Sequence, residues 1–99
     1  MKMKRNVYRL KSVKRVDGEL PSKYEPILGE RFIFVENPEV GQRMEMMFLL
    51  DYEDINKFRF YNWSTRPLIK IYLEHGFTFE TSKAIYQIED LSYEIEIQL

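Results

Sequence analysis

Hydrophobic and polar residues alternate one by one along most of the chain, which is the pattern of β-strands that bury one face. Turn-forming residues interrupt this alternation about every eight to twelve residues. No segment carries a helical pattern longer than one turn. The pattern predicts an all-β fold, a small antiparallel barrel or sandwich of about six to seven short strands with a long first loop. We expect residues 1–99 to form a single β-barrel domain.

The first predicted strand covers residues 5–16, and alternation divides it into two faces. One face is expected to hold Tyr8, Leu10, Ser12 and Val16. The other face carries Val7 and Val13 among a stripe of basic residues, which are Arg5, Arg9, Lys11 and Arg15. The strand is therefore predicted to present a basic outer face.

Residues 17–30 contain two prolines and two glycines, which predict a long loop. The apolar residues of this loop are expected to fold back over one end of the barrel, as a single helical turn. These residues are Tyr24, Ile27 and Leu28.

The middle of the chain predicts two paired strands, residues 31–36 and 43–52. A further strand is expected over residues 57–63, with Phe58 and Phe60 in the core, and the segment "STRP" is expected to break it. A hairpin follows over residues 68–81, with a tight turn centred on His75 and Gly76.

In that hairpin the inward residues are expected to be Ile69, Ile71, Leu73, Phe77 and Phe79. After Thr81 the apolar residues change parity by one position, which requires a bulge or turn at residues 81–83. The last predicted strand is residues 93–99, with its inward face formed by Tyr93, Ile95, Ile97 and Leu99.

Two segments together resemble small uncharacterised β-barrel proteins of Firmicutes phages and mobile elements. The first is "VYRLKSVKRVDGELPSKY…LG", Val7 to Gly29, and the second is "GFTFETSKAIYQIEDL", Gly76 to Leu91. The chain departs from that pattern at Lys83 and Ala84, where many of those proteins carry Asn-Ser. The resemblance covers about half of the chain and implies a compact barrel, without supplying catalytic residues.

The sequence carries no pattern typical of an enzyme, so we expect no catalytic residue, no metal ligand and no cofactor. Cysteine is absent, which excludes disulfides and thiolate sites. The one histidine, His75, is expected to be a solvated turn residue. Asp51, Glu53 and Asp54 lack the spacing of a calcium loop. The basic start lacks the apolar run of a secretory signal, and no segment is long and apolar enough to span a membrane, so we expect a cytoplasmic protein.

Charge is unevenly distributed along the chain. Residues 1–15 contain seven Lys or Arg and no acid, whereas all sixteen acids follow. Two hypotheses explain this asymmetry. The basic strand pairs with the acidic last strand, where Glu94 and Glu96 face outward, or it binds an external anion such as a nucleic acid or an acidic protein.

The stretch "KFRFYNWSTRPLI", residues 57–69, combines four aromatic rings with three positive charges. Three interpretations remain open for it. The rings cover one end of the core, they form a protein interface, or they stack on the bases of a single-stranded nucleic acid. The candidate partner-binding residues are Arg59, Tyr61, Trp63 and Arg66.

The leading hypothesis is a non-enzymatic protein-binding module. If the resemblance holds, it is an accessory or inhibitory protein of a bacterial phage or mobile element. One alternative is a single-stranded nucleic-acid-binding small barrel, and another is a homo-oligomeric structural subunit. A protein partner is expected first, with nucleic acid or a further copy of the chain as alternatives and no membrane partner.

Overall fold

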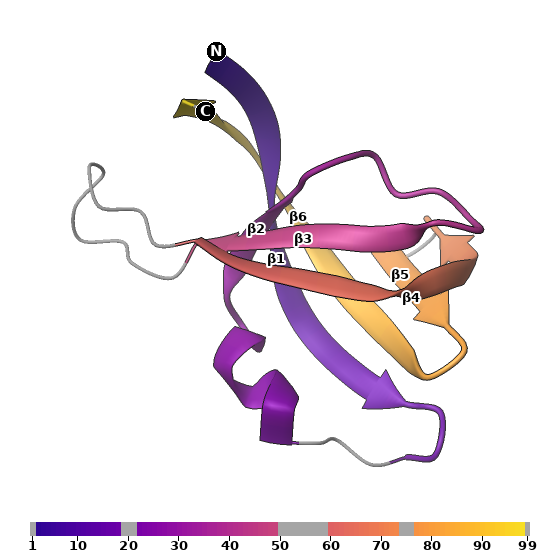
Figure 1. The fold of residues 1–99 in the computed structure, drawn as a ribbon. Helices are drawn as coiled ribbons and strands as arrows, with labels where there is room; N and C mark the ends of the chain where they lie inside the picture. Colours follow the sequence, from indigo (N-terminus) through magenta and orange to yellow (C-terminus); the bar gives the residue numbers. More distant parts are fainter. Residues whose placement is uncertain (1, 19–21, 50–59, 74–76, 99) are drawn as a thin grey trace.

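The computed structural model describes residues 2–18, 22–49, 60–73 and 77–98. These residues form six strands and one short 3-10 helix, η1, and each strand pairs antiparallel with the next (Figure 1). The last strand returns to the first, so the sheet closes into a barrel. The prediction of a small all-β antiparallel barrel is confirmed. The elements are β1 (Lys2–Arg15), η1 (Ser22–Ile27), β2 (Arg31–Phe34), β3 (Arg43–Leu49), β4 (Phe60–Tyr72), β5 (Phe77–Thr81) and β6 (Ala84–Gln98).

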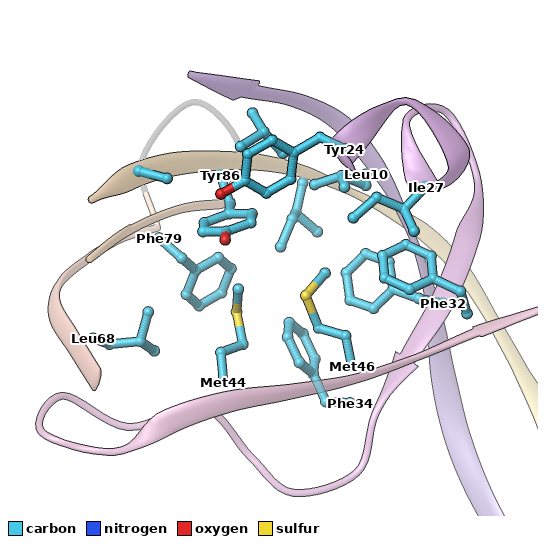
Figure 2. Packing of buried hydrophobic residues seen from close by; sticks show 14 residues of the cluster. Leu10, Tyr24, Ile27, Phe32, Phe34, Met44, Met46, Leu68, Phe79 and Tyr86 are labelled. Atoms are coloured by element: carbon cyan, nitrogen blue, oxygen red, sulfur yellow. The ribbon is translucent and has the colours of Figure 1, made fainter. Parts of the chain in front are cut away.

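The core fills the barrel with side chains from alternate positions of the strands. In β3, Met44, Met46 and Phe48 are buried, while Glu45 between them is exposed. Figure 2 shows the two methionine side chains pointing into the space between the aromatic rings. A two-residue period therefore holds in β3 from Met44 to Phe48, and the adjacent Leu49 is buried as well.

The predicted fold-back of the first loop is confirmed. Tyr24 and Ile27 lie in η1 and are buried, and Leu28, which follows η1, packs against the same core. Backbone hydrogen bonds join this segment to β1, since the Gly29 N–H donates to the Leu10 carbonyl at 2.8 Å. Gly29 has φ of +77°, a conformation that suits glycine, and the chain turns there into β2.

The predicted break at "STRP" is wrong, because β4 runs continuously through it. A bulge lies between the pairs Arg43–Pro67 and Glu45–Ser64, so β4 has one residue more than β3 at this point. The extra residue lets Pro67 sit in the strand, although it has no N–H to donate to the ladder. Thr65 is buried within the bulge, and its hydroxyl oxygen accepts a hydrogen bond from the backbone N–H of Met44 in β3.

Ile69 and Leu73 do not face inward as predicted, and a second irregularity in β4 lies beside them. The pairing of β4 with β5 shifts between Leu68 and Lys70. Leu68 is buried and Ile71 packs against the core, whereas Ile69 and Leu73 are exposed. The predicted hairpin between the two strands is confirmed by their antiparallel pairing.

The predicted change of parity after Thr81 is confirmed as the turn from β5 to β6. Thr81 is buried, and the backbone N–H groups of Lys83 and Ala84 donate hydrogen bonds of 3.2 and 3.1 Å to its hydroxyl oxygen. Tyr86 and Ile88 then continue the buried face in β6. One side chain therefore closes the turn that changes the parity.

The strand predicted for residues 93–99 is the end of one long strand, β6, rather than a separate element. The kink between its two halves lies at Ser92, which has φ of +59°. The Ser92 N–H donates a hydrogen bond of 2.8 Å to the Asp90 carboxylate. Beyond the kink, Ile95 packs against a second apolar cluster, but Tyr93 is exposed, so its predicted inward position is wrong.

Simple alternation also fails in β1, because its pairing with β6 shifts at two places. The buried residues are Val7, Leu10 and Val13, which are three positions apart. Val16, expected on the inner face, lies after the strand and is exposed. The shift between Leu10 and Ser12 places one extra residue, Lys11, in β1, so Arg5 and Arg9 do not share a single face with Arg15.

Both ends of the described chain lie side by side beyond the barrel, where β1 and β6 continue as a two-stranded ribbon (Figure 1). Opposite charges face each other across these strands, because Lys4 pairs with Glu96 and Arg9 with Glu89. The hypothesis that the basic first strand pairs with the acidic last strand is confirmed for this part of β1.

Several expectations fall outside the described residues. They concern Phe58, Arg59, the turn at His75 and Gly76, and the acidic residues Asp51, Glu53 and Asp54. The side chain of Phe60 is likewise not described. In the described part of the chain, no helix has the length and apolar character that crossing a membrane requires.

Candidate functional site

A pocket of about 360 Å³ lies between β4 and the end of the barrel where β1 ends and β5 turns into β6. Figure 1 shows η1 crossing the same end. Five elements of the chain contribute to its wall. The lining residues are Arg15, Tyr24, Trp63, Ser64, Thr65, Arg66, Thr81, Lys83 and Tyr86.

Three aromatic rings form the inner wall of this pocket. The ring centres of Tyr24 and Trp63 are 5.3 Å apart, and those of Tyr24 and Tyr86 are 6.3 Å apart with the rings edge to face. Tyr24 and Tyr86 lie against each other at one boundary of the core in Figure 2. Tyr61 extends the wall outward, since its ring centre is 6.2 Å from that of Trp63 and its side chain is exposed. The rings thus continue from the core to the surface.

The Tyr86 hydroxyl lies within this aromatic group and is kept in its neutral form. Burial raises the pKa of Tyr86 above the ordinary value, and the neighbouring Tyr24 acts in the same direction. The hydrogen bond from Trp63 lowers the pKa, but by less. The Tyr86 hydroxyl therefore keeps its proton to a higher pH than an exposed tyrosine does.

Three cations surround the opening of the pocket. Arg66 and Lys83 are exposed, and the Arg15 side chain is 33% exposed. Arg15 forms one ion pair, from Nη2 to Asp17 at 3.2 Å, while its Nε is buried without a hydrogen-bond partner among the described residues. None of the described lining residues carries a carboxylate. The site is therefore suited to an anion.

Local backbone structure brings these cations together. The Val16 N–H donates a hydrogen bond of 3.0 Å to the Lys83 carbonyl, which holds the end of β1 beside the β5–β6 turn. Arg66 follows Thr65 in the bulge of β4, and the Thr65 hydroxyl donates to the Arg66 carbonyl at 2.8 Å. The turn and the bulge, two departures from regular alternation, thus supply two of the three charges.

The structure brings together three residues that the sequence singled out in two separate groups, namely Arg15, Trp63 and Arg66. Tyr61 lies beside them, and Arg59 lies outside the described residues. Trp63 packs against the core while lining the pocket, so it occupies the rim. This agrees with the interpretation in which the rings cover one end of the core.

The other residues of the predicted basic face lie elsewhere. Arg5 lines a different hollow, close to Glu94, and Arg9 lies opposite Glu89. The end of β1 lacks such acidic neighbours in β6, because Lys14 is paired with Ile85 and Arg15 with Ala84. Acidic residues of β6 therefore lie opposite the first part of β1, whereas at its end Arg15 is paired with Asp17.

Sequence reasoning missed Lys83, Tyr24 and Tyr86 as site residues. The parity change at residues 81–83 predicted a turn there, but alternation alone does not reveal which strand end the turn adjoins. The sequence predicts Tyr24 over the end of the barrel, which is correct, and Tyr86 is buried in the same core cluster. Their contribution to a pocket follows from the closure of the barrel.

A second hollow, of about 570 Å³, has the opposite charge. Its wall includes Glu36, Glu39 and Glu45, with Arg43 as the one cation among its described lining residues. Within the described ranges, no three His, Cys, Asp or Glu residues form a group that could hold a metal ion. The cationic pocket is thus the better candidate for a functional site, because it unites aromatic and basic side chains.

Comparison of the chain with known protein families, with curated proteins and with solved structures found no significant match.

Proposed function

We propose that this chain is a non-enzymatic binding module that docks a negatively charged segment of a partner protein. The observation that supports this proposal is the convergence of Arg15, Arg66 and Lys83 around a pocket without carboxylates, beside the aromatic pair Tyr61 and Trp63. Arginine, tyrosine and tryptophan are the residues that contribute most to binding at protein interfaces. In this proposal the partner places an acidic group in the pocket and an apolar group against Tyr61.

The biological setting in this proposal comes from the resemblance of Val7 to Gly29 and Gly76 to Leu91 to phage and mobile-element barrels. The module acts in the bacterial cytoplasm as an accessory or inhibitory protein, where its partner is a host or phage protein.

A matched pair of variants on one strand tests the binding surface. Tyr61 and Tyr72 are 44% and 45% exposed, and both lie in β4, as do the exposed cations Arg66 and Lys70. We expect Tyr61→Ala/Arg66→Ala to lose a partner that the wild type captures from a Firmicutes lysate, whereas Lys70→Ala/Tyr72→Ala keeps it. Capture of the same partners by both double variants would refute the proposed surface.

Single-stranded nucleic-acid binding is the second candidate function. It is favoured by the exposed lysines Lys11 and Lys14, which continue the positive charge of Arg15 along β1. Binding through phosphates weakens steeply with salt. A few phosphate contacts lower the affinity about tenfold or more when the salt concentration rises from 50 to 200 mM. A gel-shift titration with short oligonucleotides at two salt concentrations tests this candidate, and the lack of any shift at low salt removes it.

A further inference from the structure

The charges of the cationic pocket indicate what kind of anion it accepts. Arg15, Arg66 and Lys83 come from the end of β1, the bulge of β4 and the β5–β6 turn, so they approach the pocket from three directions. Because Asp17 is already paired with Arg15, about two positive charges remain for a ligand, and a single carboxylate would balance only one of them. A phosphate monoester carries about −1.5 to −2 charge at neutral pH and presents three strong acceptor oxygens.

The hydroxyl groups of the pocket are already engaged within the protein. Ser64 donates to the Glu45 carboxylate at 3.0 Å, Thr65 donates to the Arg66 carbonyl, and Thr81 accepts the N–H groups of its own turn. Binding therefore depends on the cations, which include the unpartnered Nε of Arg15. Charge-assisted hydrogen bonds of this type are about twice as strong as neutral ones.

Carboxylates beside the pocket limit the length of the anion. Glu45 lies next to Ser64 on one side, and Asp17 is paired with Arg15 on the other. A nucleic acid would bring successive phosphates close to these acids, whereas one isolated phosphate would not. We infer that the pocket binds a single phosphomonoester, a ligand class that deepens the proposed function and rests on it.

The single tryptophan of the chain, Trp63, makes the test direct, because it lines the pocket and reports on its occupation by fluorescence. We expect glycerol 2-phosphate and a phosphoserine peptide to change this fluorescence in a saturable manner at constant ionic strength. Dimethyl phosphate and acetate, each with one negative charge, should bind at least tenfold more weakly. Equal binding of acetate or dimethyl phosphate would overturn the inference.

Two substitutions of exposed lysines provide the matched comparison. Lys83→Ala should weaken glycerol 2-phosphate at least tenfold, whereas Lys70→Ala, in β4 outside the pocket, should leave it unchanged. Arg66→Ala provides a second exposed variant and should weaken binding similarly. Unchanged affinity in Lys83→Ala and Arg66→Ala would overturn the assignment of the site, with the circular dichroism of each variant showing that it is folded.

Further arms of the titration distinguish the sources of the phosphate. A phosphoserine peptide that binds tenfold more tightly than glycerol 2-phosphate supports a phosphorylated protein, and equal affinities support a small phosphomonoester. An oligonucleotide without terminal phosphate that binds more tightly than both overturns the inference. If phosphomonoesters fail to bind while Tyr61→Ala/Arg66→Ala still loses the partner, the proposed function stands and only the phosphate inference fails.

Discussion

The backbone N–H of Met44 in β3 donates a hydrogen bond of 3.1 Å to the side-chain hydroxyl of Thr65 in β4. The same hydroxyl donates to the carbonyl of Arg66, and the Arg43 guanidinium donates to the carbonyl of Thr65 at 3.2 Å. A side chain thus replaces a backbone partner at the bulge, where the regular ladder is interrupted. This arrangement keeps β4 continuous and positions Arg66 at the pocket.

Replacement of Thr65 by valine should destabilise the protein. Valine has nearly the same shape but leaves the buried Met44 N–H without a partner, which costs about 1–3 kcal/mol of unfolding free energy. Urea unfolding measures this loss, and hydrogen exchange of the Met44 amide locates it. Thr65→Ser keeps the hydroxyl and should keep the amide protected, so equal exchange in the two variants would contradict this role.

Stability at high pH should depend on Tyr86. Its pKa is raised in the folded state, mainly by burial, above the ordinary value of 10.0. The unfolded chain therefore loses this proton first as the pH rises above 10, and the contribution of neutral Tyr86 to stability is lost between the unfolded and the folded pKa. The unfolding free energy of the wild type should fall in this range.

Tyr86→Phe isolates this effect from the other six tyrosines of the chain. The variant lacks the titrating group, so its unfolding free energy should fall less steeply above pH 10. The difference in slope approaches about 1.4 kcal/mol per pH unit. Parallel pH profiles of the two proteins, measured by chemical unfolding, would show that Tyr86 ionises equally in both states.

Charged residues that lie opposite one another on β2, β1 and β6 lead to a third prediction, which concerns stability. Arg9 lies between Arg31 of β2 and Glu89 of β6, so Glu89 offsets two neighbouring cations in one row. Glu89→Lys should lower the unfolding free energy by about 1 kcal/mol, because like charges directly opposite each other repel. Adding Arg9→Glu should recover part of this loss. Simple additivity of the two substitutions in a double-mutant cycle would argue against coupling.

At position 92 we expect glycine to be more stable than alanine, which is the reverse of the usual order in strands. Its φ of +59° is unfavourable for residues with a Cβ by about 1–2 kcal/mol, whereas glycine adopts it freely. Ser92→Gly should therefore be more stable than Ser92→Ala in thermal unfolding. At an ordinary strand position the alanine variant is more stable than the glycine variant. A more stable Ser92→Ala would therefore contradict a kink at Ser92.

Regular strands could be predicted from the sequence, whereas bulges could not. In β3 the residues Met44, Met46 and Phe48 are buried at alternate positions, and the strand itself is predicted by the sequence. In β1 and β4 the buried face changes within the strand, because one strand of a pair carries an extra residue at a bulge. Whether an extra residue fits depends on the partner strand. The partner is not visible in a local pattern, so Ile69 and Val16 were assigned to the wrong side.

The sequence points to some residues of the candidate site, but not to the way in which they come together. Arg15 stood out through the charge of the first strand, and Trp63 and Arg66 through an aromatic-basic stretch some fifty residues later. Their convergence depends on how β4, η1 and the β5–β6 turn surround one end of the closed barrel. Lys83 carries no local signal beyond the turn that it occupies.

The pairing of β1 with β6 also determines when this protein can fold during synthesis. Lys2 pairs with Gln98, so the ladder between β1 and β6 forms only after β6 has been synthesised. Contacts between residues so distant in sequence slow folding, typically to milliseconds or seconds, since loop-closure entropy is lost before they form. Until then the edge of β1 that pairs with β6 stays open on the nascent chain, and an unpaired strand edge promotes aggregation.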